Sequence, residues 1–151
     1  MKFTRREILS IGGGAVLAAG IGLPSLSAHA DAAEVDKMIK SFAGSAKVES
    51  GTVSLSTPEI AENGNTVPVS VSVESPMTKE DHVTAVMLLA TGNPRPGLIT
   101  FHFTPLSGEA SATTRVRLAK TQDVVAVAKT STGKVFMDKK NVKVTIGGCG
   151  G

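Results

Sequence analysis

The chain has no tryptophan, no tyrosine and a single cysteine, Cys149, among its 151 residues. With one thiol, any disulfide that the chain forms must join it to another molecule. The missing aromatic rings are those on which single-stranded nucleic acids usually stack. No C-x-x-C-H motif is present for haem, and the few histidines are scattered, whereas a zinc site needs three or four converging ligands. We therefore expect no metal site, no cofactor and no nucleic-acid binding.

The first thirty residues have the pattern of an export signal. A twin-arginine motif, Thr-Arg-Arg-Glu-Ile-Leu, occupies residues 4–9, and a small-residue cleavage site, Ala-His-Ala, occupies residues 28–30. The apolar stretch at residues 11–23 is shorter than the roughly 20 residues that a membrane span needs. We predict a cleaved twin-arginine signal peptide at residues 1–30 and a periplasmic mature chain without a membrane span. Since this route carries folded proteins, a folded partner without its own signal explains its use best.

Little net charge remains after signal removal. The formal net charge of the whole chain is +3. Loss of Lys2, Arg5, Arg6 and Glu7 leaves 13 basic against 12 acidic side chains. Nucleic-acid-binding domains need a concentrated basic surface, so this balance also argues against such a role.

The mature chain begins with a predicted helix at residues 31–43, within a helical segment 31–44. Asp31 and Glu34 resemble a capping box, and Gly44 is a typical helix stop. One helical face carries the apolar side chains Val35, Met38, Ile39 and Phe42. This face packs either on the main domain or on a partner, and periodicity alone does not decide between the two.

From residue 45 to 146 the pattern is that of short strands. Valines alternate with proline and serines over residues 67–73, which is typical of a half-buried strand. Asn63-Gly64 predicts a turn, and Asn93-Pro94 begins a loop that ends the apolar strand 83–90. The predicted strands are residues 53–55, 67–73, 83–90, 99–103, 113–119, 123–129, 135–137 and 142–146. This count predicts an all-β fold, an immunoglobulin-like antiparallel β-sandwich.

The last five residues, 147–151, are predicted to form a flexible carrier arm. Cys149 stands between two glycine pairs, Gly147-Gly148 and Gly150-Gly151. Glycine tolerates nearly any backbone angle, and the extended reach from Ile146 to Cys149 is about 10 Å. The arm suits a thiol that is delivered into the active site of another protein. The residues alone leave open a covalent carrier, an intermolecular disulfide or a tail without function.

Catalysis by this chain itself is not expected, and we assign no catalytic residue. A nucleophilic cysteine needs a base held within hydrogen-bonding distance. His102 lies between two phenylalanines that face the other way, and His82 lies in an acidic loop. Neither histidine is in a position that predicts a pair with Cys149.

Several segments together resemble the SoxY family, the sulfur-carrier subunit of the periplasmic thiosulfate-oxidising Sox system. They are the twin-arginine signal, Pro58-Glu59-Ile60-Ala61-Glu62-Asn63-Gly64, Val67-Pro68-Val69, Ser75-Pro76-Met77, Asn93-Pro94, Thr114-Arg115-Val116-Arg117-Leu118-Ala119 and the terminal Gly147-Gly148-Cys149-Gly150-Gly151. The terminal motif is the most specific of these.

The resemblance implies a function and a set of partners. A c-type cytochrome would conjugate thiosulfate to the Cys149 sulfur as an S-thiosulfonate, and a sulfate thiohydrolase would leave a persulfide. A sulfur dehydrogenase would oxidise that sulfur further where such an enzyme is present. The resemblance also implies a heterodimer with a SoxZ-like subunit.

Two other functions are compatible with parts of the chain. Ubiquitin-like sulfur carriers also end in Gly-Gly, but they act in the cytosol, which disagrees with the export signal. A periplasmic interaction module could instead use Cys149 for an intermolecular disulfide, including a homodimer.

Overall fold

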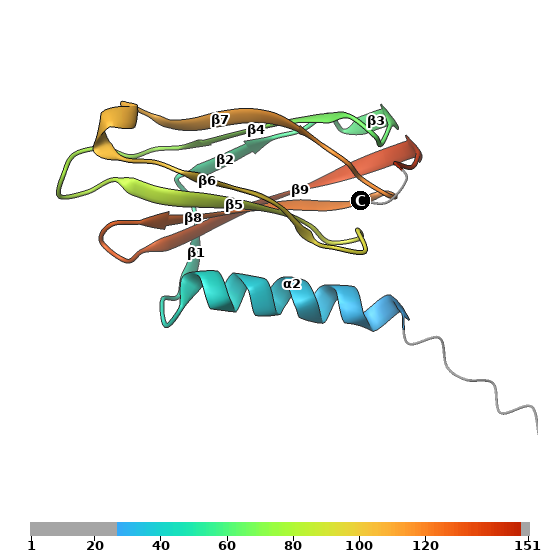
Figure 1. The fold of residues 1–151 in the computed structure, drawn as a ribbon, viewed down its shortest axis with the longest axis horizontal. Helices are drawn as coiled ribbons and strands as arrows, with labels where there is room; N and C mark the ends of the chain where they lie inside the picture. The colour runs from blue at the N-terminus through green and yellow to red at the C-terminus, as the bar shows by residue number, and fades with distance from the viewer. Residues whose placement is uncertain (1–26, 149–151) are drawn as a thin grey trace, which may run out of the picture.

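The computed structural model describes residues 27–148, with side chains from residue 32 (Figure 1). One helix precedes a series of strands that form two packed sheets. The elements in chain order are α2 (Ser27–Ala43), β1 (Val48–Ser50), β2 (Val53–Ser56), β3 (Ile60–Asn63), β4 (Val67–Val73), β5 (Val83–Ala90), β6 (Gly97–His102), the 3-10 turn η1 (Pro105–Ser107), β7 (Ala110–Val116), β8 (Gln122–Thr130) and β9 (Val135–Ile146).

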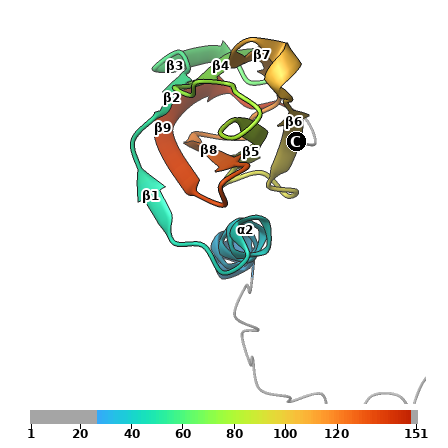
Figure 2. The same cartoon turned by 90° about the vertical axis from the view of Figure 1, so that its left-hand side faces the viewer.

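The two sheets form a β-sandwich, as predicted. One sheet has the order β1-β9-β8-β5-β6, with β3 also paired to β9, and the other has the order β2-β4-β7. Pairing is antiparallel except that β1 and β3 run parallel to β9. Figure 2 shows the sandwich along its strands, with the helix outside the larger sheet.

The alternation seen in the sequence sets the inner face of the smaller sheet. In β4 the four valines at 67, 69, 71 and 73 are buried, while Pro68 and Ser72 face solvent. These valines pack against inward residues of β5 and β8, such as Leu88 and Ala126, in one core cluster. The period-two pattern therefore identified the half-buried strand correctly.

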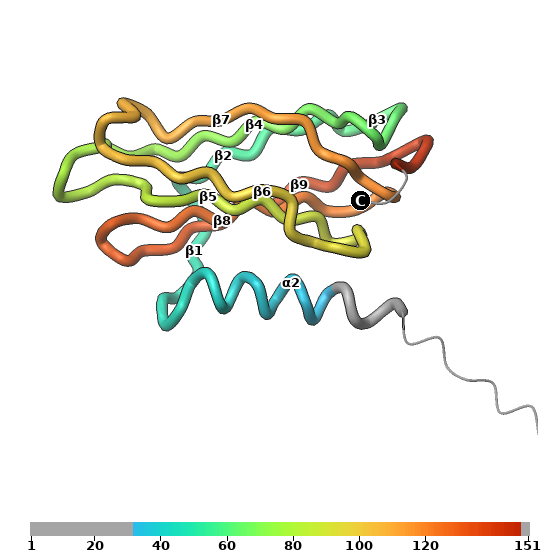
Figure 3. Tube along the Cα trace, in the orientation of Figure 1, coloured from blue at the N-terminus to red at the C-terminus, as the bar shows by residue number. Residues whose placement is uncertain are grey.

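Strands β5 and β8 are apolar on both faces because each face is covered. Their second face meets α2, where Met87, Leu89, Val125 and Val127 form a separate cluster with Val35. Figure 3 shows the trace of α2 running alongside this sheet. Of the two docking alternatives for the helix, the structure shows packing on the main domain.

The helix ends as predicted but begins earlier. Gly44 adopts a positive φ of 66°, and its N–H donates to the Lys40 carbonyl oxygen. Helix α2 begins at Ser27, four residues before the predicted start, and the Asp31 side chain expected to cap it lies outside the described side chains.

Three strand predictions need correction. Residues 135–146 form one continuous strand, because Asp138, Lys139 and Lys140 pair with β8 although their side chains are polar. Strands β1 and β3 were not predicted, since each is short and at most half of its residues are apolar. Strand β7 ends at Val116, so Leu118 is buried from a loop rather than from a strand.

Candidate functional site

The described chain ends at Gly148, the residue that precedes the predicted attachment cysteine. Cys149, Gly150 and Gly151 lie outside the described residues. The site is therefore built from the residues that hold Gly147 and Gly148. Both belong to the end of the sandwich where β3, β7 and β9 end (Figure 1).

Three backbone hydrogen bonds join the end of β9 to two distant loops. The Gly64 N–H donates to the Ile146 carbonyl oxygen (2.7 Å), and the Leu118 N–H donates to the Gly64 carbonyl oxygen (2.8 Å). The Gly148 N–H donates to the Leu118 carbonyl oxygen (2.9 Å), so that each of the three segments is bonded to the other two. We call this arrangement of Gly64, Leu118 and residues 146–148 the C-terminal clasp.

The clasp requires glycine because the backbones approach too closely for a Cβ. A Cβ on Gly64 would overlap the Leu118 carbonyl oxygen and come within 2.7 Å of the Gly148 nitrogen. A Cβ on Gly147 would overlap the Ala119 carbonyl oxygen, and one on Gly148 would lie 2.8 Å from the Gly64 carbonyl oxygen. The last two contacts involve backbone atoms that cannot rotate away. These glycines provide space for close packing.

This finding changes the expected role of Gly147 and Gly148. The sequence predicted that they give the arm its freedom, but Gly148 is buried and hydrogen-bonded, and Gly147 packs on Ala119. Neither has a positive φ. The fixed part of the chain thus reaches to the residue bonded to Cys149, whose Cα follows at about 3.8 Å.

Asn93 and Gln122 hold the loop on which the clasp is built. The Asn93 side chain, fully buried, donates from Nδ2 to the Arg117 carbonyl oxygen (2.8 Å). Its Oδ1 accepts from the Ala119 N–H (2.9 Å) and from Gln122 Nε2 (2.8 Å). The carboxamide therefore fixes the loop on both sides of Leu118.

The same loop is tied to its neighbours through Gln122 and Thr121. Gln122 Nε2 also donates to the Lys120 carbonyl oxygen (3.0 Å), and its Oε1 accepts from the Gly92 N–H (2.7 Å). The Val144 N–H of β9 donates to Thr121 Oγ1 (2.9 Å). These contacts join the β5–β6 loop, the β7–β8 loop and β9 into one unit.

His82 and His102 lie at the end of the sandwich opposite to the clasp. His82 precedes β5, and its N–H donates to Ser131 Oγ in the β8–β9 hairpin (3.1 Å). His102 pairs with Ala85 near the start of the same strand. The eight residues of β5 span roughly 26 Å between that end and Thr91 beside the clasp. Neither of these two histidines is near Gly148.

An ion pair lies beside the helix. Asp123 accepts a hydrogen bond from Asn141 Nδ2 (2.8 Å) and forms a salt bridge with Lys139 Nζ (3.3 Å). The hydrogen bond from Asn141, followed by the nearby Lys139 charge, keeps the pKa of Asp123 below its ordinary value despite an opposing effect of burial. This carboxylate contributes to stability and shows no catalytic geometry.

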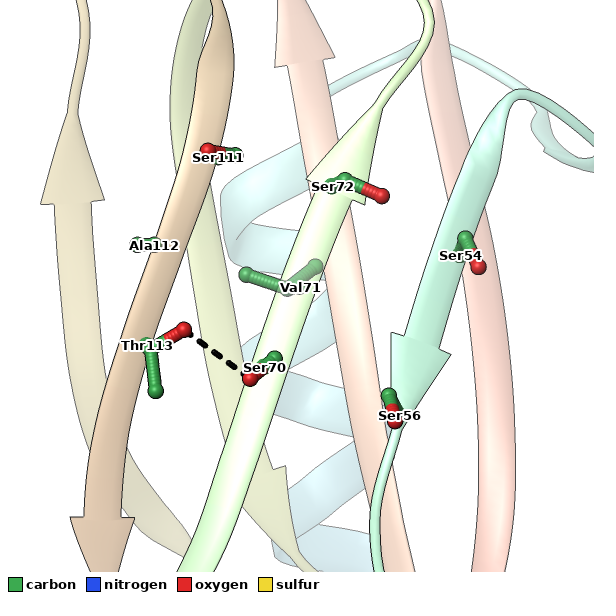
Figure 4. Close-up of a pocket in the computed structure, with 8 residues that line it drawn as sticks. All are labelled: Ser54, Ser56, Ser70, Val71, Ser72, Ser111, Ala112 and Thr113. Atoms are coloured by element: carbon green, nitrogen blue, oxygen red, sulfur yellow. Dashed lines mark hydrogen bonds between the residues drawn. The ribbon is translucent and has the colours of Figure 1, made fainter.

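The exposed face of the smaller sheet is covered by hydroxyl groups. A shallow hollow of about 140 Å³ there is lined by small side chains, as Figure 4 shows: Ser54, Ser56, Ser70, Val71, Ser72, Ser111, Ala112 and Thr113. Ser70 and Thr113 are hydrogen-bonded to each other (2.9 Å). The lining has no acid, base or thiol, so it offers no catalytic group.

Within residues 27–148, no helix has the length and hydropathy of a membrane span. In the same part of the chain, no group of three or more His, Cys, Asp or Glu side chains is placed to bind a metal ion.

Sequence reasoning missed the clasp, although it had marked its parts. Gly64 was interpreted as a turn residue and Asn93 as the start of a loop. The turn signal at Gly64 and the loop signal at Asn93 are present in the sequence, but local patterns do not show which loops contact each other in the fold. The pairing of β3 with β9 brings Asn63 opposite Ile146, and this long-range register creates the site.

Comparisons with known proteins identify the family and the fold. The family described as "Sulfur oxidation protein SoxY" matches residues 39–149. The solved structure of the sulfur carrier protein SoxY from Chlorobium limicola f thiosulfatophilum is 32% identical with a TM-score of 0.63, covering 76% of this chain and 99% of that one. Superoxide reductase (neelaredoxin) from Ignicoccus hospitalis has a TM-score of 0.56 at 22% identity, over 62% of this chain and 80% of that one, a likeness of fold alone. A sequence search of curated proteins finds no match.

Proposed function

Because the chain belongs to the SoxY family, we propose that it is a covalent carrier of sulfur intermediates in thiosulfate oxidation. The cargo is attached to the thiol of Cys149, the single cysteine of the chain. The observation that carries this proposal is the family match, which extends to residue 149 and therefore includes that cysteine.

The attachment is a two-electron oxidation. The Cys149 thiol and the terminal sulfur of thiosulfate form a sulfur–sulfur bond, giving Cys–S–S–SO₃⁻, while the thiol proton goes to solvent. Two electrons leave and are accepted by a c-type cytochrome partner. Water then cleaves the bond to the sulfonate group, so that sulfate and a proton are released and Cys–S–SH remains.

In this proposal the chain is a substrate and its partners are the enzymes. Three partners act in turn on the Cys149 sulfur: the conjugating cytochrome, a sulfate thiohydrolase and, where present, a sulfur dehydrogenase. The positions of His82 and His102 support this division, since both lie at the end of the sandwich opposite to Gly148. The receiving enzyme then supplies the group that activates the thiol.

We further propose that the carrier is exported by the twin-arginine route and acts in the periplasm with a SoxZ-like subunit. Residues 4–9 and 28–30 support the route, because they have the motif and the cleavage site that it uses. Cleavage after residue 30 retains the whole apolar face of α2, from Val35 to Phe42.

Intact-mass measurement tests the carrier function. The mature chain, its partner subunit, the conjugating cytochrome and thiosulfate are incubated together, and the carrier is then weighed. We expect a mass increase of one thiosulfate on Cys149, reversed by dithiothreitol and absent from Cys149→Ser.

Two outcomes would contradict the proposal. Added mass at the Gly151 carboxylate would indicate chemistry of the ubiquitin-like type. A reducible dimer without any thiosulfate adduct would indicate a disulfide-forming interaction module.

A further inference from the structure

The clasp has a consequence for how the thiol is presented. We propose that Asn93 is a positioning residue for Cys149, acting through the β7–β8 loop to hold Gly148 in place. This inference rests on the proposed carrier function. In this proposal the arm that carries the thiol starts after Gly148, at a fixed point on the end of the sandwich, and not at Ile146.

The first step of the argument is the placement of Asn93. Its side chain is 0% exposed and uses three hydrogen bonds, one from Nδ2 and two to Oδ1. Burying a carboxamide costs free energy unless its polar atoms form hydrogen bonds. A buried carboxamide whose atoms are all hydrogen-bonded fixes the positions of the groups bonded to it. Its backbone partners, the Arg117 carbonyl and the Ala119 N–H, flank Leu118 directly.

The second step is the link from Leu118 to Gly148. The Leu118 carbonyl oxygen is the acceptor for the Gly148 N–H, and a Cβ on Gly64 would strike that same oxygen. The Leu118 carbonyl oxygen therefore lies between Gly64 and Gly148, and both restrict the position of this peptide. A shift of this loop would remove the hydrogen bond that holds the residue before Cys149.

The third step concerns the receiving enzymes. With Gly148 fixed, the Cys149 Cα lies about 3.8 Å from a buried residue. An enzyme that accepts the thiol must then contact the surrounding surface, to which Lys120 and the Asn63–Gly64 turn belong. Fixing the backbone of one residue costs conformational entropy that corresponds to about a tenfold change in a binding constant. Because Gly148 is already ordered in the free carrier, this cost does not arise again when an enzyme binds the thiol.

Amide hydrogen exchange, followed by NMR on the full-length mature chain, tests the placement directly. We expect the Gly148 amide to be protected in the wild type. In Asn93→Ala it should exchange at least about tenfold faster, while the Val127 amide in the core strand β8 stays protected. A Gly148 amide that exchanges at the rate of an unstructured chain in the wild type would overturn the proposal.

The matched control is Thr130→Ala. Thr130 is also buried, and its hydroxyl bonds the Lys134 N–H (3.1 Å) in the hairpin at the opposite end of the sandwich. This variant should lose comparable stability without releasing Gly148. Equal release of Gly148 by both variants would show that Asn93 acts through global stability only.

Two more variants keep the test informative if Asn93→Ala does not fold. Asn93→Asp keeps the Oδ acceptor for Ala119 but loses the donor to the Arg117 carbonyl, so it should release Gly148 partially. Gly64→Ala inserts a Cβ into the clasp and should release Gly148 while leaving Asn93 intact. Retained protection of Gly148 in both variants would contradict the proposal.

Kinetics separate this inference from the carrier function itself. With the conjugating cytochrome, we expect Asn93→Ala to lower kcat/KM for the carrier about tenfold, while thiosulfate still adds completely to Cys149. Unchanged kcat/KM would overturn the positioning role. If the wild-type chain accepts no thiosulfate, the carrier proposal fails, and the exchange result for Gly148 still decides the placement.

Discussion

At the scale of residues, the same residue type serves different physical purposes in this chain. Gly44 ends a helix because its φ is positive, whereas Gly64 and Gly148 lack a positive φ and allow backbones to meet. Sequence alone identified the helix stop, since that signal is local. It could not identify the packing role, because the partners of Gly64 lie more than fifty residues away.

Asp123 makes stability depend on pH. Its folded-state pKa is lowered, so its contribution to stability is complete above the unfolded pKa of about 3.9 and is lost as the pH falls through the folded pKa. For Asp123→Asn we expect a loss of about 0.5–1 kcal/mol at pH 7, and a smaller difference in unfolding free energy between pH 7 and pH 3 than in the wild type.

Urea unfolding at the two pH values measures both quantities. Asn141→Ala removes the hydrogen bond that lowers the pKa most and should act in the same direction. If Asp123→Asn retained the full pH dependence of the wild type, this carboxylate would not be its source.

At the scale of elements, periodicity predicted which side chains of a helix or strand are buried. It failed for polar segments that form a strand only because neighbouring strands pair with them. Strand β4 and the apolar stripe of α2 follow their periods closely and were predicted. The polar middle of β9 is ordered by β8 on one side, and its ends are ordered by β1 and β3 on the other. The sequence of residues 138–141 contains no local pattern from which these neighbouring strands could be predicted.

Helix α2 contributes to the stability of the domain through its apolar face. Val35 is 6% exposed and packs in the cluster between the helix and the larger sheet. Val35→Ala should lower the free energy of unfolding by about 1–2 kcal/mol, because it removes two buried methyl groups. Lys37→Ala, on the exposed face of the same helix, should change it by less than about 0.5 kcal/mol.

Denaturant unfolding of the mature chain without its partner gives these values. The absence of the partner is essential, because it separates packing within the chain from packing between chains. Two neutral variants would mean that the helix face contributes nothing to the isolated domain.

At the scale of the whole molecule, the clasp and the β8–β9 hairpin mark opposite ends of an elongated sandwich (Figure 1). Gly148 lies at one end, so a disulfide between two copies through Cys149 should join them end to end. On storage in air we expect such a dimer to form, since a disulfide of this chain can only join its single cysteine to another molecule.

Small-angle X-ray scattering distinguishes the arrangements. The maximum dimension of the end-to-end dimer should approach twice that of the monomer and return to the monomer value with dithiothreitol. Cys149→Ser should stay monomeric under the same conditions. A dimer hardly longer than the monomer would indicate side-by-side packing and would contradict the end-to-end arrangement.

The parallel pairing of β9 with β1 and β3 also has a consequence for when the fold becomes complete. Strand β9 contacts the earliest strands and β8 together, so none of these pairings exists until residues 135–146 have been synthesised. A chain that stops short of residue 135 leaves three strands without their neighbour. Because β9 ends at Ile146, the same short stretch of synthesis completes the fold and brings out the residues that lead to the cysteine.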